Sequence, residues 1–562
     1  MSQRKKTLLV GLDAAGWDYV NPLLADDQLP ALARLMADGA SGVLQSTMPA
    51  LTPVAWSSII TGKNPGKHGV FDMTARRPGS YDFVPVNAQK RLGTPFWTRL
   101  NEAGVRVGLV NVPFTYPPDA VDGFVVVGFG APGSVPDLAY PREALAWIES
   151  EYGRYVPNVD SSLLRSGRHD AIFAAEQELQ SRQVDIALGL AEKYDVDVLV
   201  INLMILDHIN HKAPDLADVH NAIRQLDQDL QRLVAGFQPD NVMAISDHGA
   251  RRVKGDFLLH VWLREQGYSV QAERPLADRD DAENWVVKEW LQNHHGWHGT
   301  QERLARAAIR RLLPLLPAGR RQAFWQRVEA SVPFAVNHIA RQEQLAFDQT
   351  RLYPGASYSS ILYVNRQGRE PQGNVPATEQ ARLAAEVRDK LLQLVDPETG
   401  APLFSAVYTA DSLYDGPFQE HAPDIVIDSY DSEWNVLSTF RRGPRVEALR
   451  DRYFVENLSD FGHHSRDGIV VCAGTDFATG RENIEGHGRD VPATLLRLYD
   501  VAIPEDLDGQ PLDALLDPQF LQTHPLRTQP GDDITAVVVD DLYSEAETEE
   551  IVSHLRALGY VD

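Results

Sequence analysis

Three short apolar runs in the first half of the chain are each followed, at once or within a few residues, by an acidic side chain. Near-continuous apolar runs of about four to eight residues are typical of strands buried on both faces of a parallel sheet. Ligands of open α/β sheets bind at the C-terminal ends of such strands. We therefore predict a parallel sheet with a polar site along one edge. The runs are Thr7–Leu12 before Asp13, Asp197–Leu203 before Asp207, and Asn241–Ile245 before Asp247.

Helical and strand patterns alternate along much of the chain, which predicts an α/β protein with a mostly parallel central sheet flanked by helices. Helices are expected at Leu29–Met36, Thr94–Ala103, Phe173–Lys193, Pro214–Gly236 and Val491–Tyr499. Further strands are expected at Val43–Ser46, Val105–Val112, Val121–Gly128, Ser360–Asn365, Asp424–Ile427 and from Ile469 onward.

The composition changes in the middle of the chain. From about Glu273 to Gln344 the strand signals fade and Trp, Arg, Leu and Ala become frequent, which indicates a mainly helical insertion. A basic and apolar helix around Ala305–Leu316 fits a membrane surface, a partner or packing against the core, and packing is the simplest alternative. With 562 residues the chain exceeds one small domain. We expect an α/β core in two parts, 1–255 and 346–515, a helical insertion over 256–345, and an acidic tail over 516–562 that ends in a helix.

The charge balance argues against one broad class of function. The chain has 53 Lys and Arg against 78 Asp and Glu, so its net charge is −25. This charge repels nucleic-acid backbones and argues against a protein that coats nucleic acid. A small phosphate ester remains compatible with it, because bound cations can reverse the sign of the charge locally.

Neither a membrane span nor a signal peptide is expected. No apolar run reaches the roughly 18 residues that a membrane helix needs. A basic N-terminus precedes the first apolar run, but Asp13 interrupts that run too soon for a signal peptide. We therefore expect a cytoplasmic protein. The single cysteine, Cys472, excludes an intramolecular disulfide and a multi-cysteine metal site, and its apolar neighbours predict a packed strand residue.

Thr52 lies at the start of a predicted helix. It precedes Pro53 and an apolar run, and this order is typical of a helix N-cap and first turn. A hydroxyl there faces the positive end of the helix dipole and free backbone N–H groups, where a phosphate oxygen is also stabilised. Thr52 is therefore either a cap or a nucleophile in an anion site, and taken alone the cap is the simpler interpretation.

Six carboxylate and imidazole side chains near the predicted strand ends are candidate metal ligands. Such mixtures without thiolate suit Zn²⁺ or Mn²⁺, and less often iron or cobalt. Six ligands are more than one tetrahedral ion needs, but they suffice for two ions, with the Thr52 hydroxyl completing one site. Asp207 and His211 share one face if their turn is helical. The six are Asp13, Asp207, His211, Asp247, His248 and His464, the last in a loop before a strand.

Each of these motifs alone has an ordinary structural explanation. An Asp-His pair is usually a turn or a satisfied polar pair, and 17 histidines allow chance placements. Only the occurrence of all these motifs together is evidence for a metal site. We assign no role to His208, His220, His294, His295 and His487.

A series of short motifs between residues 8 and 509 covers nearly the whole predicted core. The motifs are Leu8–Asp13, Thr52, Thr61–Gly62, Pro65–Gly69, Asp207–His211, Ser246–Gly249, Ala422–Val426, Gly462–His464, Gly468, Asp490–Thr494 and Leu507–Gly509. Together they resemble the alkaline phosphatase superfamily. The resemblance is to its type I phosphodiesterase/nucleotide pyrophosphatase-like branch and to related bacterial phosphohydrolase and phosphomutase-like proteins.

The resemblance implies an alkaline-phosphatase-like core that holds two divalent metal ions, Zn²⁺ in the first place with Mn²⁺ as the alternative. It also implies that Thr52 is the nucleophile and takes the phosphoryl group covalently. The implied ligand sets are Asp13, Thr52, Asp247 and His248 for one ion, and Asp207, His211 and His464 for the other.

Residues around Thr52 distinguish the branches of this superfamily. The sulfatase branch is disfavoured because its Cys/Ser-x-Pro-x-Arg motif is missing: Pro53, Val54 and Ala55 follow Thr52. The cofactor-independent phosphoglycerate mutase branch uses a serine nucleophile. The phosphodiesterase branch often carries an Asn shortly after the motif that corresponds to His68–Gly69, and this chain has Phe71 and Asp72 nearby.

The sequence therefore predicts a metal-dependent hydrolase of small phosphate esters, with phosphodiesters favoured. The alternatives are a phosphomutase, phosphotransferase or phosphomonoesterase at the same site, and a non-catalytic binding protein of this fold. The substrate and the oligomeric state, a homo-oligomer included, are left open.

Overall fold

The computed structural model describes residues 4–133, 135–272, 345–356, 360–438, 453–456, 462–532 and 543–561. Most of the predicted helical insertion, including the helix around Ala305–Leu316, lies outside these residues. The division of the chain into core, insertion and tail therefore stays a prediction.

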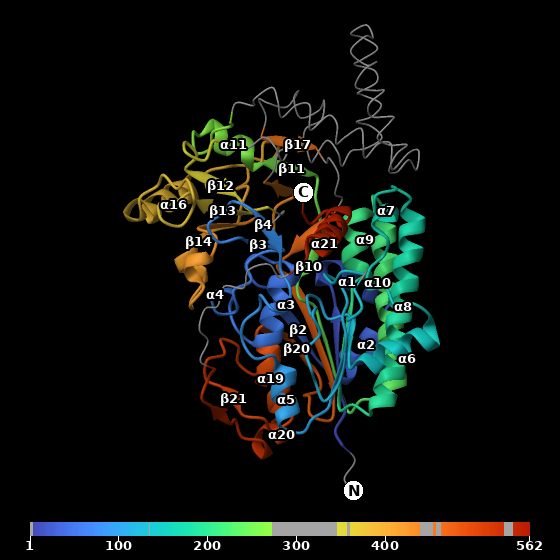
Figure 1. Cartoon of the computed structure of the whole chain (residues 1–562). Helices are drawn as coiled ribbons and strands as arrows, with labels where there is room; N and C mark the ends of the chain where they lie inside the picture. Colours follow the sequence, from blue (N-terminus) through green and yellow to red (C-terminus); the bar gives the residue numbers. More distant parts are fainter. Residues whose placement is uncertain are drawn as a thin grey trace.

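In the described part of the chain, nine strands form one central sheet (Figure 1). They are β1 (Thr7–Leu12), β2 (Gly39–Gln45), β5 (Val107–Val110), β6 (Gly123–Val126), β7 (Ala139–Tyr140), β8 (Val198–Leu203), β9 (Asn241–Ile245), β19 (Asp467–Gly474) and β20 (Arg481–His487). Their order is β20-β2-β19-β9-β1-β8-β5-β6-β7. The pairs β1–β8, β1–β9, β5–β8, β5–β6 and β2–β20 are parallel, whereas β19 and β7 are antiparallel to their neighbours. The predicted mostly parallel sheet is confirmed.

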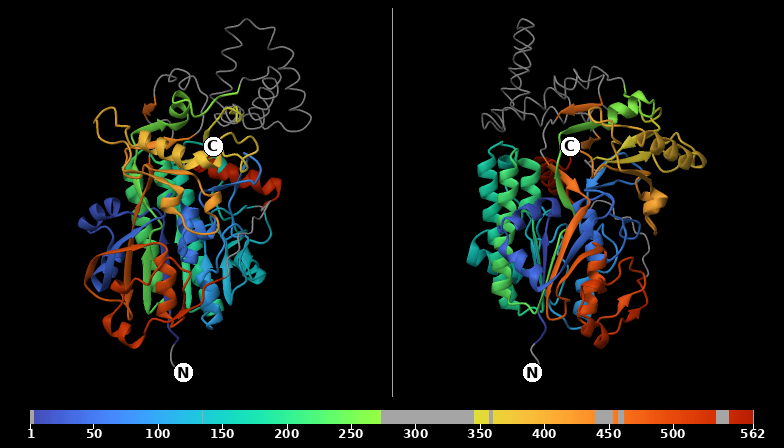
Figure 2. Two further views of the ribbon diagram at one scale, coloured as in Figure 1. Left: turned by 90° about the vertical axis from the view of Figure 1, so that its left-hand side faces the viewer. Right: turned by 180° about the vertical axis from the view of Figure 1, so that it is seen from behind.

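Helices cover both faces of this sheet, as expected for strands whose residues are buried on both sides (Figures 1 and 2). One face carries α1 (Trp17–Ala25), α2 (Pro30–Asp38), α6 (Arg142–Tyr152), α8 (His169–Tyr194), α9 (Ile205–Lys212) and α10 (Leu216–Phe237). The other face carries α3 (Thr52–Thr61), α5 (Phe96–Glu102) and α19 (Asp490–Leu498).

Smaller sheets lie beyond the end of the central sheet that is opposite to the N-terminus (Figure 2). One is antiparallel and contains β12 (Leu352–Pro354), β13 (Ile361–Val364), β15 (Ile425–Asp428) and β14 (Ala406–Thr409), with α16 (Ala377–Leu391) packed against it. The others at this end are β16 (Trp434–Leu437), β11 (Gly255–Leu258) and β17 (Phe454–Glu456); β10 (Gly249–Arg252) and β18 (Gly462–Ser465); β3 (Thr74–Arg76) and β4 (Phe83–Pro85). A further small sheet, β21 (Ile503–Pro504) and β22 (Thr528–Gln529), lies at the other end of the central sheet, near the N-terminus (Figure 1).

Short helices and one longer C-terminal helix complete the described structure. The short ones are α4 (Pro65–His68), α7 (Ser161–Leu164), α11 (Leu259–Glu265), α17 (Ala410–Leu413), α20 (Pro518–Thr523) and the 3₁₀ turns η2 (Gln419–His421) and η3 (Asp513–Leu515). The longer one is α21 (Glu545–Leu558).

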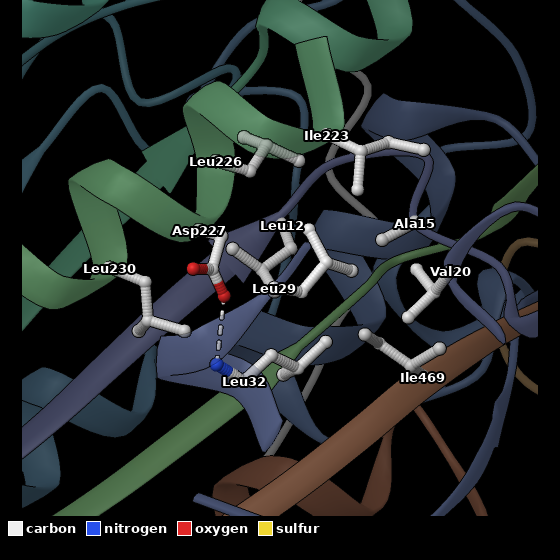
Figure 3. Close-up of a pocket in the computed structure, with 10 residues that line it drawn as sticks. All are labelled: Leu12, Ala15, Val20, Leu29, Leu32, Ile223, Leu226, Asp227, Leu230 and Ile469. Atoms are coloured by element: carbon white, nitrogen blue, oxygen red, sulfur yellow. Dashed lines mark hydrogen bonds between the residues drawn. The ribbon is translucent and has the colours of Figure 1, made fainter. Parts of the chain in front are cut away.

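Helix α2 begins against a buried carboxylate from α10. Asp227 accepts hydrogen bonds from the backbone N–H groups of Leu32, at 2.8 Å, and Ala31, at 3.1 Å (Figure 3). These N–H groups have no partner within the helix, so the carboxylate acts as a cap supplied from another element. The apolar pocket beside Asp227 has a volume of about 10 Å³, room for about one water molecule. It is a packing gap and not a ligand site.

Strand β2 begins earlier than Val43, where the sequence pattern places it. The residues before Val43 are small, and a Cβ atom at Gly39 would lie 1.9 Å from the Cys472 carbonyl oxygen of β19. At Gly42 it would lie 1.9 Å from the Ile484 carbonyl oxygen. Glycine is thus required here for close approach between strands, and it also removes the apolar signal by which a strand is predicted.

Candidate active site

The seven predicted site residues meet at the C-terminal ends of β1, β9 and β8. Asp13 follows β1, and Asp247 and His248 follow β9. Asp207 and His211 lie one turn apart on α9, the helix that begins two residues after β8. Thr52 opens α3, and His464 lies on β18 opposite Ala250 of β10. The prediction of a loop at His464 is wrong, because its segment pairs with the strand that follows His248.

The site contains two groups of three possible metal ligands. Within each group, the ligand atoms lie within 4.8 Å of one another, and the two groups share one histidine. In the first group, the Asp13 Oδ1 atom is 3.7 Å and the Asp247 Oδ2 atom 3.4 Å from His248 Nε2. In the second, Asp207 Oδ1 is 3.3 Å from His464 Nε2. The groups are Asp13, Asp247 and His248, and Asp207, His248 and His464.

His211 joins the second group. Its Nε2 atom is 3.1 Å from His464 Nε2 and 3.6 Å from Asp207 Oδ1. This follows from the helical form of α9, since residues four apart lie on one face.

Backbone carbonyl groups set the tautomers of two of these histidines. The Nδ1 atom of His464 is 2.7 Å from the Ala50 carbonyl oxygen, and that of His248 is 3.1 Å from the Gly249 carbonyl oxygen. Because a carbonyl oxygen only accepts, each Nδ1 carries the hydrogen. When such a ring is neutral, its Nε2 carries a lone pair directed at the group of carboxylates, and this is the form that binds a metal ion.

Several buried carboxylate oxygens at this place accept no hydrogen bond of ordinary geometry from the described residues. They are Asp13 Oδ1, Asp207 Oδ1 and both oxygens of Asp247. An unpartnered buried carboxylate is costly, and buried charges are normally paired or bound to metal. Asp13 Oδ1, Asp207 Oδ1 and Asp247 Oδ2 lie instead 3.3–3.7 Å from the Nε2 atoms of His248 and His464.

The electrostatics of the carboxylates also favour a bound cation at this place. Burial raises the pKa of Asp13 well above its usual value, and repulsion from Asp247 and Asp207 adds to this rise. Burial and the Asp207 charge also raise the pKa of Asp247, against nearby backbone N–H groups that favour its charged form. Positive charge placed among these oxygens would remove the repulsion.

The pKa values of Asp207 and His248 show which groups face each other. At Asp207, burial acts to raise the pKa, but the neighbouring His211 and His464 outweigh it and hold the pKa well below its usual value. Burial, with repulsion from His464, holds the pKa of His248 well below its usual range, so its ring is neutral. Neutral imidazole is the form that binds metal.

Thr52 is the first residue of α3 and not its N-cap. The Leu51 carbonyl accepts the first helical hydrogen bond, from Ala55, and the residue in the cap position is Leu51. The Thr52 hydroxyl makes no capping bond; it lies 3.3 Å from His248 Nε2. The predicted cap is therefore wrong by one position, and the hydroxyl is directed to the histidine and carboxylate group instead.

Some residues that contact the site carried no recognised sequence signal. Asn202 donates to Asp13 Oδ2 at 2.8 Å, and Asn111 donates to the Asn202 carbonyl at 2.8 Å. An asparagine inside the apolar strand β8 is a usable signal, because a buried amide needs a partner. Tyr560, near the C-terminus, donates to Asp207 Oδ2, and nothing in its local sequence indicates this contact.

A cavity of about 260 Å³ adjoins the loop before Thr52 and the residues after His464. Three of its lining residues are basic: Arg466, His487 and Arg489. The Nε atoms of both arginines are buried and have no hydrogen-bond partner among the described residues, whereas Arg466 donates through Nη1 to Asp428 Oδ2 at 3.2 Å. The cavity is thus suited to an anionic group. His487, to which no role was assigned, lines this cavity.

His208, also assigned no role, has a structural partner. Its Nδ1 atom lies 3.0 Å from Glu176 Oε2, and both side chains are buried.

Among the residues that the structure describes, no helix is long and apolar enough to cross a bilayer.

Comparison with solved structures places the fold. Phosphonoacetate hydrolase from Sinorhizobium meliloti 1021 in complex with phosphonoformate is 14% identical, with 87% of this chain and 94% of that chain covered and a TM-score of 0.50. The same enzyme in complex with phosphonoacetate has 14% identity, the same 87% and 94% coverage, and a TM-score of 0.51. Murine ectonucleotide pyrophosphatase/phosphodiesterase 5 in complex with AMP is 10% identical, with 91% and 100% covered and a TM-score of 0.48.

No curated protein matches this chain. A family model described as type I phosphodiesterase/nucleotide pyrophosphatase matches residues 7–464, which include every predicted site residue. The chain therefore belongs to the type I phosphodiesterase/nucleotide pyrophosphatase family of the alkaline phosphatase superfamily and is a hydrolase that acts on phosphoester bonds.

Proposed function

We propose that the protein cleaves phosphate esters, phosphodiesters in the first place, at a site with two divalent metal ions and Thr52 as nucleophile. The observation that carries this proposal is the set of buried carboxylate oxygens that accept no hydrogen bond of ordinary geometry from the described residues and lie 3.3–3.7 Å from histidine Nε2 atoms. One ion would be held by Asp13, Thr52, Asp247 and His248, and the other by Asp207, His211 and His464.

The residues fit the metals that the family implies. They offer oxygen and imidazole nitrogen and no thiolate, a donor set that suits Zn²⁺ and, as the alternative, Mn²⁺. The described ligand atoms lie close enough to share an ion without large movement, since they are grouped within 4.8 Å. When bound, such ions would act as Lewis acids that stabilise negative charge on the attacking, phosphoryl and leaving oxygens.

Thr52 is suited to attack phosphorus. Its hydroxyl is buried and free of any capping bond, and it projects from the first turn of α3, whose N-terminal dipole favours a phosphoryl anion. The bond from Oγ to phosphorus forms as the bond to the leaving oxygen breaks; the leaving oxygen keeps the electron pair of that bond, and the hydroxyl proton passes to solvent or to the leaving oxygen. Water then attacks phosphorus, the bond to Thr52 Oγ breaks, and the hydroxyl regains a proton.

The substrate we propose is a small anionic ester. The cavity that adjoins the loop before Thr52, with Arg466, His487 and Arg489 in its lining, supports this, because it brings basic side chains to that loop in a chain of net charge −25. A group bound there would orient the ester relative to Thr52.

The experiment that tests this function compares wild type with Thr52→Ala in hydrolysis of aryl phosphodiesters and monoesters, with metal analysis of the same preparations. We expect two ions per chain in wild type, loss of activity on chelation with recovery on adding Zn²⁺ or Mn²⁺, and near-normal metal content with no turnover in Thr52→Ala. Full activity in metal-free protein, or an active Thr52→Ala, contradicts the proposal. Added alcohols would reveal phosphoryl transfer in place of hydrolysis.

A further inference from the structure

The C-terminal residues of the chain reach the candidate metal site. Helix α21 lies beside α9, the helix that carries Asp207 and His211 (Figure 1). It ends at Gly559, whose φ of 101° lies in the left-handed region that a residue with a Cβ atom rarely adopts. The chain turns there and buries the next residue, Tyr560, to 3% exposure.

Tyr560 contacts the second ligand group directly. Its hydroxyl donates a hydrogen bond to Asp207 Oδ2. Its ring lies edge-on to His211, with the centroids 5.0 Å apart and the planes at 79°, and its centroid is 6.2 Å from that of His464. Phe129 packs on another side of the ring at 5.6 Å. The tyrosine is thus held by its neighbours with its hydroxyl on the carboxylate.

The two oxygens of Asp207 have different surroundings as a result. Oδ2 accepts the hydrogen bond from Tyr560, whereas Oδ1 accepts no hydrogen bond of ordinary geometry from the described residues and lies 3.3 Å from His464 Nε2. A donor on one carboxylate oxygen fixes the plane of the group and leaves the other oxygen as the ligand atom. The hydroxyl therefore selects Oδ1 for the ion.

Packing of α21 holds Tyr560 in place. Ile551, Leu555 and Leu558 are buried against the core. At its N-terminus the helix is closed by a capping box between Ser544 and Glu547, and the Gly133 N–H donates to Glu550 at 2.8 Å. These contacts order a segment 353 residues away from Asp207 in sequence.

We propose that Tyr560 is a positioning residue for Asp207, so that docking of the C-terminal helix completes the metal site formed by Asp207, His211 and His464. This inference rests on the two-metal function proposed above. It assigns no chemical step to the tyrosine, and the helix becomes part of the metal site although it lies after the segment matched by the family.

Tyr560→Phe tests the inference, because it removes the hydroxyl and keeps the ring. The control is Tyr543→Phe, since Tyr543 stands just before the same helix and its hydroxyl contacts only the Val86 and Gly130 carbonyls in the described structure, both at 3.4 Å. Chelator-treated proteins are titrated with Zn²⁺ against a chromophoric competitor, and with Co²⁺ for its ligand-field spectrum.

In Tyr560→Phe we expect one of two Zn²⁺ dissociation constants to rise about 10–100-fold, the effect typical of losing a hydrogen bond to a ligand. The Co²⁺ spectrum of that ion changes, the other ion binds as in wild type, excess Zn²⁺ restores turnover, and Tyr543→Phe changes neither constant. Unchanged binding of both ions by Tyr560→Phe overturns the inference. Increased activity with unchanged affinity also overturns it, since the tyrosine would then obstruct the site. A wild type that binds no Zn²⁺ instead contradicts the proposed function.

Discussion

Replacing Asp247 by Asn should change the stability of the protein in opposite directions with and without metal. Both oxygens of Asp247 are buried without a hydrogen-bond partner of ordinary geometry in the described structure, and its charge repels that of Asp207. An amide has nearly the same shape and no charge. The substitution therefore removes the repulsion in metal-free protein and one ligand in metal-loaded protein.

The magnitudes follow from the cost of an unsatisfied buried group and from mass action. Removing such a carboxylate should stabilise the metal-free protein by about 1–3 kcal/mol. An ion at a free concentration a thousand times its dissociation constant stabilises the folded state by about 4.1 kcal/mol. If Asp247→Asn loses one of two ions, it loses that 4.1 kcal/mol, so metal-loaded wild type should exceed it by about 1–3 kcal/mol.

The assay is urea unfolding in chelator and in Zn²⁺ buffer, with Asp229→Asn as the control. Asp229 is also buried, but its oxygens accept from Gln180 at 2.9 Å, Gln225 at 3.0 Å and Arg232 at 2.8 Å. Asp229→Asn should be destabilised under both conditions. If Asp247→Asn is also less stable than wild type in chelator, the carboxylates are not a source of stored repulsion, and the reasoning is wrong.

The same variant makes the pH dependence testable. Asp13 and Asp247 have folded-state pKa values raised above the usual 3.8. A raised pKa contributes stability that is fully present below the unfolded value and is lost as the pH rises through the folded value. The contribution of Asp13 and Asp247 to the stability of metal-free wild type is therefore lost as the pH rises above 3.8, and the stability of Asp247→Asn relative to wild type should increase over the same range.

Two further predictions concern the cavity and the core. Arg489→Gln should raise KM for an aryl phosphodiester about tenfold with kcat retained, which is the loss expected for one charge-assisted hydrogen bond. The control is Arg481→Gln, which changes an exposed strand residue. Equal KM values for Arg489→Gln and wild type would contradict the anion-binding interpretation of the cavity. Burial, aided by Arg91, lowers the pKa of His68 from 6.5 to about 3, so its contribution to stability is present above 6.5 and is lost as the pH falls toward 3. As the pH falls from 6.5 toward 3 in chelator, wild type should lose about 1.4 kcal/mol of free energy of unfolding per pH unit more than His68→Gln does. If the two proteins show the same change of unfolding free energy with pH, His68 is not buried in its neutral form.

Most of the fold could be predicted from the apolar runs that are each followed by an acidic residue. β1, β8 and β9 pair in register in the centre of the sheet, and their apolar residues are buried because helices cover both faces. Asp13, Asp207 and Asp247 come together for the same reason, since the ends of parallel strands meet at one edge. The buried Cys472 of β19 was likewise predicted.

Other features depend on contacts that no local pattern encodes. The β10–β18 pair that places His464 joins segments more than 200 residues apart, so the local sequence around His464 predicts only a loop. Tyr560 reaches Asp207 only through the packing of α21. The sequence predicts the cap one residue too late, at Thr52 instead of Leu51, because Thr-Pro fits both the cap and the first turn and only the backbone distinguishes them.

The most direct test of the account is to trap the proposed intermediate. Wild-type, metal-loaded protein is mixed with an aryl phosphodiester, quenched in acid during turnover, digested and analysed by mass spectrometry. We predict that one phosphate-containing group is attached to the peptide that contains Thr52, that its position is Thr52, and that it is absent from chelated protein and from Thr52→Ala. Turnover with an unmodified Thr52 peptide at every quench time, together with an active Thr52→Ala, would contradict the account.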